Sequence, residues 1–252
     1  MVDRVFNFVA NNPFGLSNVG SYASPDLVDI DGDRDLDVFV GNVDGNTLFF
    51  RNTGNASNPV FAAPITNPFG LSAIGFWAFP VFADIDGDGD SDAFVGEGGS
   101  THFFKNIGTV NNPVFAAPQS NPFGLTVGGN SDFVDIDADG DLDAFIGDGS
   151  GNTLFFKNTG TASNPVFAAA ITNPFGLTYV GNYANPTFVD IDGDGDLDVF
   201  IGWGHYFGEG DMQFFRNVGT SSQPVFHSAG KNLFGLGGTG QYFNSTFGDI
   251  DN

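Results

Sequence analysis

Four short acidic segments carry most of the chemistry that this chain can offer. Each spans nine residues and places an aspartate at positions 1, 3, 5, 7 and 9. In a loop of this pattern the carboxylates at positions 1, 3, 5 and 9 converge, and position 7 offers its backbone carbonyl. Hard oxygens in flexible geometry suit Ca²⁺. We therefore expect about four Ca²⁺ sites, whose candidate ligands are Asp29, Asp31, Asp33, Asp35 and Asp37; Asp84, Asp86, Asp88, Asp90 and Asp92; Asp135, Asp137, Asp139, Asp141 and Asp143; and Asp190, Asp192, Asp194, Asp196 and Asp198.

The charge of these segments favours a bound cation over a bare acidic hairpin. Twenty of the 30 acidic residues lie in the four segments, so the negative charge is local. Two carboxylates ~5 Å apart repel by roughly 3 kcal/mol at an effective dielectric constant near 20. Mg²⁺ fits less well, because it prefers a rigid octahedron and retains its water.

Position 6 of each loop requires a sharp turn. Gly89, Gly140 and Gly195 occupy it in three loops, whereas the first loop has Arg34. A side chain there strains a left-handed backbone and brings a cation near the metal. We therefore expect the first site to be the weakest.

The elements that position these loops repeat along the chain. Asn-Pro-Phe-Gly-Leu begins at residues 12, 67, 121 and 173, and a variant occupies 232–236. One repeat contains four short segments rich in β-branched and aromatic residues, at 187–191, 197–201, 212–216 and 224–226 in the fourth copy. Four-stranded units of this length predict an all-β protein, a β-propeller of four-stranded blades. A right-handed parallel β-helix is the alternative, although its repeats are usually shorter.

The ends of the chain supply only parts of a repeat. First-strand and fourth-strand segments occur five times, whereas second and third strands occur four times. We therefore expect four full blades plus a partial fifth closed by both termini. The whole chain is then a single domain over 1–252, with repeats of approximately 1–60, 61–115, 116–167, 168–226 and 227–252.

The segment 188–202 resembles the FG-GAP/VCBS calcium-binding repeat of integrin α-subunit propellers and propeller lectins. The resemblance covers essentially the whole chain, and the aspartate loop is its specific part. It implies propeller blades with Ca²⁺ between the first and second strands, an extracellular or cell-surface setting, and adhesion or glycan binding. The chain departs from the family at Arg34, at Ala138 in place of glycine, in its unfinished last repeat, and in having fewer than the seven blades that are usual.

An aromatic residue recurs seven positions before the loops, and a long connection interrupts the fourth repeat. An aromatic ring with nearby Asn130, Asn185 or Asn244 is a plausible platform for a pyranose. Inter-blade packing and turn chemistry are the alternative. The connection 202–211 either binds a ligand or fills space beside the incomplete blade. The candidate ligand residues are Tyr22, Trp77, Tyr183, Tyr242 and Trp203.

Composition excludes several classes of function. The net charge is −23, which disfavours nucleic acid and anionic membrane surfaces as partners. No apolar run approaches the roughly 18 residues of a membrane span. The absence of cysteine rules out disulfides and thiolate chemistry. The first residues show no secretory signal, so an extracellular location rests on the family resemblance.

Catalysis finds little support in the sequence, and we expect no enzyme. No nucleophile elbow, zinc-protease helix or phosphate loop is present, and His102 and His227 have no predictable partners. The favoured function is a non-catalytic binding or adhesion module with a glycan or protein ligand. One alternative is a self-assembling homo-oligomer that pairs through the incomplete blade. A Ca²⁺-dependent polysaccharide lyase is the third.

Overall fold

The computed structural model describes residues 5–204, 210–236 and 242–250. The chain divides into two compact units, each described by itself. The first-half unit consists of Val9–Pro122 and Thr246–Asn252, and the second-half unit consists of Met1–Phe8 and Phe123–Ser245. The prediction of a single domain stays a prediction. In the described residues all secondary structure is β-strand or single-turn 3₁₀ helix, and no helix there is long and apolar enough to cross a membrane.

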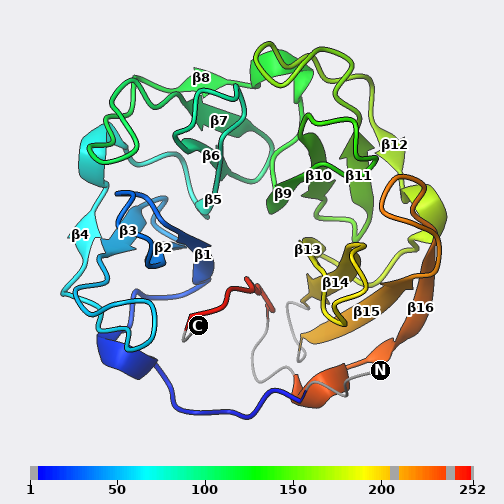
Figure 1. The fold of residues 1–252 in the computed structure, drawn as a ribbon, viewed down its shortest axis with the longest axis horizontal. Helices are drawn as coiled ribbons and strands as arrows, with labels where there is room; N and C mark the ends of the chain where they lie inside the picture. Colours follow the sequence, from blue (N-terminus) through cyan, green and yellow to red (C-terminus); the bar gives the residue numbers. More distant parts are fainter. Residues whose placement is uncertain (1–4, 205–209, 237–241, 251–252) are drawn as a thin grey trace. The chain divides into compact units, whose positions relative to one another are not determined.

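Each unit contains two antiparallel sheets of four strands in sequence order, as β-propeller blades have (Figure 1). The predicted all-β propeller architecture and its four full blades are confirmed. In the first-half unit the blades are β1 (Ser24–Val28), β2 (Asp37–Gly41), β3 (Thr47–Phe50) and β4 (Ile65–Thr66), then β5 (Phe79–Ala83), β6 (Asp92–Gly96), β7 (Thr101–Phe104) and β8 (Gln119–Ser120). In the second-half unit they are β9 (Ser131–Val134), β10 (Asp143–Gly147), β11 (Thr153–Phe156) and β12 (Ile171–Thr172), then β13 (Asn185–Val189), β14 (Asp198–Trp203), β15 (Asp211–Asn217) and β16 (Phe226–Lys231).

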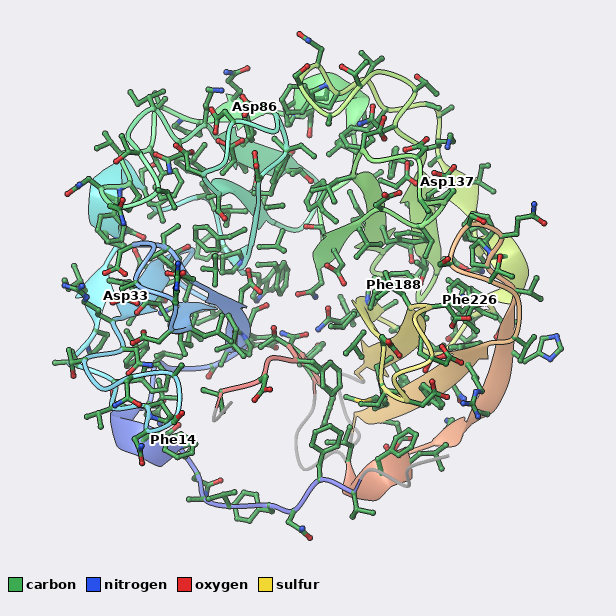
Figure 2. All side chains as sticks on the ribbon, in the orientation of Figure 1. Phe14, Asp33, Asp86, Asp137, Phe188 and Phe226 are labelled. Carbon is green, nitrogen blue, oxygen red and sulfur yellow. The ribbon has the colours of Figure 1, made fainter. Side chains whose placement is uncertain are left out.

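Phenylalanine fills the core of every blade. The central residue of each second strand is fully or almost fully buried and faces a phenylalanine of the third strand across the ladder. The ring centroids of these pairs lie 4.7–4.9 Å apart, at Phe39–Phe49, Phe94–Phe103, Phe145–Phe155 and Phe200–Phe214. Phe188 of β13 and Phe226 of β16, labelled in Figure 2, add a further ring pair at 6.0 Å. The recurring Phe-Phe sequence is thus core, as expected.

The Asn-Pro-Phe-Gly-Leu motif forms a 3₁₀ turn, and the backbone links that turn to the next repeat. The five turns are η1 (Pro13–Gly15), η2 (Pro68–Gly70), η3 (Pro122–Gly124), η4 (Pro174–Gly176) and η5 (Leu233–Gly235). In the first-half unit the N–H of Phe61 donates to the carbonyl of Phe14 at 2.8 Å. The glycine of this turn, Gly15, has φ +98°, and a Cβ there would lie 2.7 Å from the Phe61 carbonyl oxygen. The position therefore requires glycine.

The same link joins the N-terminal residues to the last turn within the second-half unit. The N–H of Phe6 donates to the carbonyl of Phe234 at 2.7 Å. The fifth repeat, however, does not build a blade in the described part of the chain. Its residues 242–250 contain no strand, so the structure does not show the partial fifth blade.

Neighbouring first strands of each unit are joined by a buried or half-buried carboxylate. Asp26 of β1 accepts a hydrogen bond of 2.8 Å from the N–H of Phe82 in β5. Asp132 of β9 accepts an equivalent bond of 2.8 Å from Phe188 in β13. Burial raises the pKa of Asp132 to about 6, although the hydrogen bonds from Phe188 and Phe133 oppose that shift.

Candidate metal centres

Each acidic loop connects the first strand of a blade to its second, and its first aspartate shapes the turn. In the third loop Oδ1 of Asp135 accepts the N–H of Asp139 at 3.1 Å, and Oδ2 accepts that of Gly140 at 3.0 Å. The equivalent bonds to Asp29, Asp84 and Asp190 fix the other three loops. The loop is therefore folded around its own first carboxylate.

Three carboxylates of every loop lie close enough to share one ion. The first, third and fifth positions each offer an oxygen, and these oxygens lie within 4.8 Å of one another in all four loops. Figure 2 labels Asp33, Asp86 and Asp137 from three of them. Such a set of hard oxygens at short separation can hold a divalent cation. The structure thus brings together the predicted ligands at positions 1, 3 and 5.

Further carboxylate oxygens in each loop are buried without a hydrogen-bond partner among the described residues. The third loop has three of them: Oδ1 of Asp137, Oδ1 of Asp141 and Oδ2 of Asp143. They come from positions 3, 7 and 9, and a buried acceptor left unpaired is costly. All three atoms recur in the first two loops, at Asp31, Asp35 and Asp37 and at Asp86, Asp90 and Asp92, and those of positions 3 and 7 recur in the fourth loop at Asp192 and Asp196. A cation that these oxygens coordinate would remove the cost.

The position-7 aspartate differs from its expected role. The loop pattern predicts that its backbone carbonyl is a ligand, whereas the structure also buries a side-chain oxygen of Asp35, Asp90, Asp141 and Asp196. Burial and then the neighbouring Asp33 raise the pKa of Asp35 to about 6. The position-7 aspartate therefore offers its side-chain oxygen, as well as its backbone carbonyl, as a candidate ligand atom.

The last aspartate of each loop is the most deeply buried. Asp37, Asp92 and Asp143 are each 1% exposed, and burial raises the pKa of each to about 7. One oxygen of each accepts a backbone N–H from the asparagine two residues after the third strand, at 2.6 Å. In the fourth loop burial likewise raises the pKa of Asp198, to about 6. The metal-free fold thus raises the pKa of these carboxyl groups, chiefly because burial disfavours their charged form and secondarily because other carboxylates lie nearby.

A basic side chain that sequence reasoning missed contacts every loop. It follows the Phe-Phe pair of the third strand and forms an ion pair with the position-3 aspartate. The pairs are Arg51–Asp31, Lys105–Asp86, Lys157–Asp137 and Arg216–Asp192. The signal was present in the sequence, because Phe-Phe-Arg-Asn or Phe-Phe-Lys-Asn recurs in all four repeats.

The backbone at loop positions 4 and 6 is left-handed in every repeat. At position 6, Gly89, Gly140 and Gly195 have φ values of 92–94°, and Arg34 has φ +74°. At position 4, Ala138 has φ +58° where the other loops have glycine. A Cβ at the three position-6 glycines would meet no atom within 4 Å, so the strain expected at Arg34 is conformational rather than steric contact.

The aromatic series lies before the first strands, and its rings pair within each unit. Tyr22 and Trp77 have ring centroids 6.2 Å apart, and Tyr183 and Tyr242 are 5.2 Å apart in an edge-on arrangement. Tyr22, Trp77 and Tyr183 all have φ between 57° and 60°, which is rare for bulky residues. Trp77 is 38% exposed. The rings therefore pack in pairs and remain partly accessible.

The long connection of the fourth repeat lies in part outside the described residues. Its Trp203 is the last residue of β14, and the Nζ of Lys231 lies 4.7 Å from the centre of the Trp203 ring.

The sequence predicted no partner for His102. The structure places its Nε2 3.1 Å from Oε1 of Glu97 and its Nδ1 3.3 Å from Oγ of Ser120. His102 therefore belongs to a polar cluster on one blade.

Comparison with known proteins agrees with this geometry. The FG-GAP-like repeat profile matches residues 29–95 and 135–201, together more than half of the chain. Among curated proteins none matches the sequence. A solved structure of the Photorhabdus luminescens Tc holotoxin pore aligns with 13% identity and a TM-score of 0.37. That alignment covers 90% of this chain, which spans only 12% of the toxin chain. On the repeat match, this chain belongs to the FG-GAP-like repeat family.

Proposed function

We propose that this protein is a calcium-loaded β-propeller that acts as a non-catalytic binding module. The observation that carries the proposal is the set of buried carboxylate oxygens without hydrogen-bond partners among the described residues, which recurs at positions 3 and 7 of all four loops and at position 9 of the first three. One such carboxylate is tolerable in a folded protein, but its repetition in four copies indicates a shared ligand. Calcium accepts six to eight oxygens in flexible geometry, and each loop offers five carboxylates.

The chemistry of the donor set favours Ca²⁺ over other metals. Every candidate ligand is an aspartate, and among the described residues no histidine belongs to the groups that lie close enough to share an ion. Zinc, copper and iron sites use nitrogen or sulfur ligands. Magnesium requires a compact octahedron and retains water. A crowded carboxylate loop with several oxygens from one segment is therefore best matched by calcium.

Titration calorimetry tests the calcium proposal. Protein stripped with EDTA and then dialysed should bind Ca²⁺ with a stoichiometry near four, and the same titration with Mg²⁺ should give much weaker heats. The matched control is a chain in which the position-9 aspartates Asp37, Asp92 and Asp143 are replaced by Asn. Loss of three of the four sites in that control is expected. Wild-type protein that takes up no Ca²⁺ would refute the proposal.

The lyase alternative is weakened by the state of the basic side chains at the loops. A lyase needs a neutral base beside the metal. The ion pair with Asp86 raises the pKa of Lys105, and the pair with Asp137 raises that of Lys157, so both lysines remain protonated. His102 faces Val95 near the end of β6 that lies away from the loop, roughly 10 Å along the strand from Asp92. These positions support binding rather than catalysis.

A glycan is the ligand class that we propose for the module, and the aromatic pairs support it. Bulky residues with positive φ are strained and tend to occur where function requires them. The partly exposed Trp77 beside Tyr22 offers an apolar ring face of the kind on which a pyranose stacks. A glycan array probed in the presence of Ca²⁺ tests this idea, with Trp77→Ala as the binding-deficient variant. An array without any hit would refute the glycan proposal and leave the calcium proposal standing.

An extracellular setting and a partial fifth blade complete the proposal. Extracellular fluid holds abundant free Ca²⁺, which suits sites whose ligands come from one short loop.

The hydrogen bond from Phe6 to Phe234 supports the partial blade, because it repeats the Phe61–Phe14 link between other repeats. Phe6→Pro removes the N–H that donates this bond and should lower the melting temperature, whereas Phe6→Ala keeps the N–H and should lower it less.

A further inference from the structure

We propose that Arg51, Lys105, Lys157 and Arg216 are built-in counter-ions of the acidic loops. They stabilise each loop in the metal-free protein and lower its affinity for Ca²⁺. The inference rests on the proposed calcium function, and it adds the residues that set the strength of the sites. It concerns side chains outside the loops, which the aspartate pattern does not reveal.

The base and the cation site share one carboxylate. In the third blade Lys157 pairs with Oδ2 of Asp137, whereas Oδ1 of the same aspartate is buried without a hydrogen-bond partner in the described chain. The second blade repeats this division between Lys105 and Asp86. A metal ion on Oδ1 and a basic nitrogen on Oδ2 would lie on opposite oxygens of a single group. The metal ion and the basic nitrogen would therefore repel each other at short range.

The base also reaches a second ligand of the loop. Nζ of Lys157 lies 3.2 Å from Oδ2 of Asp139, and Nζ of Lys105 lies 3.5 Å from Oδ2 of Asp88. In the first blade Arg51 lies 2.5 Å from Asp31 and 3.7 Å from Asp33. One basic side chain thus bridges positions 3 and 5 in these three loops. Two of the carboxylates that would surround the ion are held together by a fixed positive charge.

The placement of these four residues is selective. The chain has only seven lysines and arginines against 30 acidic residues, and four of the seven contact the loops in equivalent positions. A random distribution would not put one base on each loop. Their side chains are 31–54% exposed, so solvent can accommodate the base when a divalent cation neutralises the carboxylates.

The charge of the base can be removed without disturbing the frame of the loop. The residue after each base donates its backbone N–H to the position-9 aspartate, as Asn158 does to Asp143 at 2.6 Å. Asn158 also accepts hydrogen bonds from Gly160 and Val166 through its side-chain oxygen. None of these bonds uses the side chain of Lys157. A methionine there keeps the aliphatic length and deletes only the ammonium group.

A basic side chain at a metal site can act as a counter-ion or as a positioning residue. The two roles predict opposite changes in Ca²⁺ affinity when the side chain is removed. A counter-ion repels the incoming Ca²⁺, so its removal tightens binding. A positioning residue orients the ligand, and its removal typically weakens binding by about 10–100-fold. We infer the counter-ion role because the position-3 aspartate comes from a loop whose backbone is already fixed by hydrogen bonds to the first aspartate. Little orientation is left for the base to provide.

The test combines calcium titration with melting in EDTA. The double variant Lys105→Met/Lys157→Met should bind Ca²⁺ about tenfold more tightly at two of its four sites. In EDTA it should melt about 2–4 °C below the wild type, because two ion pairs are lost. Lys105→Arg/Lys157→Arg keeps the charge and should match the wild type in both measurements. Lys231→Met removes a base that pairs with Asp211 outside the loops, and its Ca²⁺ affinity should be unchanged.

The outcomes separate this inference from the calcium proposal. Wild-type binding with unchanged or weaker binding in the double methionine variant would overturn the counter-ion role and leave the calcium function intact. If the wild type binds no Ca²⁺, the proposed function fails and the affinity part of the inference fails with it. If the double methionine variant melts in EDTA at the same temperature as the wild type, the basic side chains do not stabilise the metal-free loops, whichever result the calcium titration gives.

Discussion

The backbone N–H of Asn158 donates a 2.6 Å hydrogen bond to Oδ1 of Asp143, while Oδ2 of that aspartate is buried without a partner among the described residues. One carboxylate thus joins the third strand to the acidic loop and also presents a free oxygen to it. The same bond recurs at Asn52, Asn106 and Asn217 in the other blades. A metal ion held by the proposed site would therefore be coupled to blade packing through this aspartate.

Chelation should destabilise the protein strongly. Four sites occupied at about 100-fold above their dissociation constants contribute roughly 11 kcal/mol to the free energy of unfolding. Removal of the metal by EDTA should then lower the melting temperature by roughly 20 °C or more. Differential scanning calorimetry in Ca²⁺ and in EDTA measures the shift. Equal melting temperatures in both buffers would contradict the account.

Replacing Arg34 with Gly should tighten the first site. The backbone at position 34 is left-handed, with φ +74°, and glycine adopts this region without strain. The substitution also removes a positive charge from the loop. Titration calorimetry should show the weakest site gaining several-fold in affinity, and the free energy of unfolding should rise by about 1 kcal/mol. Gly89→Arg is the matched reverse change, because Gly89 occupies the same loop position in the second repeat. It should weaken Ca²⁺ binding at the second site.

Asp143→Asn should separate metal binding from the fold of the loop. The amide oxygen can still accept the N–H of Asn158, but the charge that the ion needs is gone. We expect the number of Ca²⁺ ions bound per chain to fall by one, while the metal-free protein becomes slightly more stable at neutral pH. Asp44→Asn removes the same charge from an exposed hairpin and should change neither property. A full set of sites in Asp143→Asn would show that this carboxylate is not a ligand.

The metal-free protein should lose stability as the pH rises from about 4 to 7. Burial raises the pKa of Asp37, Asp92 and Asp143 to about 7, so the folded chain holds protons that the unfolded chain has released. The stability from these groups is complete below the unfolded pKa of about 4 and disappears as the pH passes the folded value. With Ca²⁺ the trend should reverse, because protons then compete with the metal. Melting curves across pH in EDTA and in Ca²⁺ check both signs.

Much of the fold follows from the repeated residues alone. Strand order, the acidic connection and the Phe-Phe core could be predicted because alternating patterns such as that at Phe39 and Phe49 are local and occur four times. The position of the acidic loops was predictable for the same reason. The predicted partial fifth blade is not shown by the described residues, because pairing of segments near the two ends depends on long-range contacts that no local pattern specifies.

The details of the site were only partly predictable. The spacing of the aspartates indicated convergence of positions 1, 3 and 5, but not that the side chain of Asp35 would turn inward. The ion pair between Lys157 and Asp137 joins residues 20 positions apart, on different elements, so the loop sequence alone could not reveal it. The recurring Arg-Asn or Lys-Asn after Phe-Phe was the available signal.

A crystal structure of the protein grown in calcium chloride tests the central claim most directly. We predict an ion in each of the four loops, about 2.3–2.6 Å from the buried oxygens of positions 3 and 7 and, in the first three loops, of position 9. Anomalous scattering would identify it as calcium. Well-ordered loops that hold no ion in calcium chloride, with their carboxylates facing only the basic side chains, would contradict it.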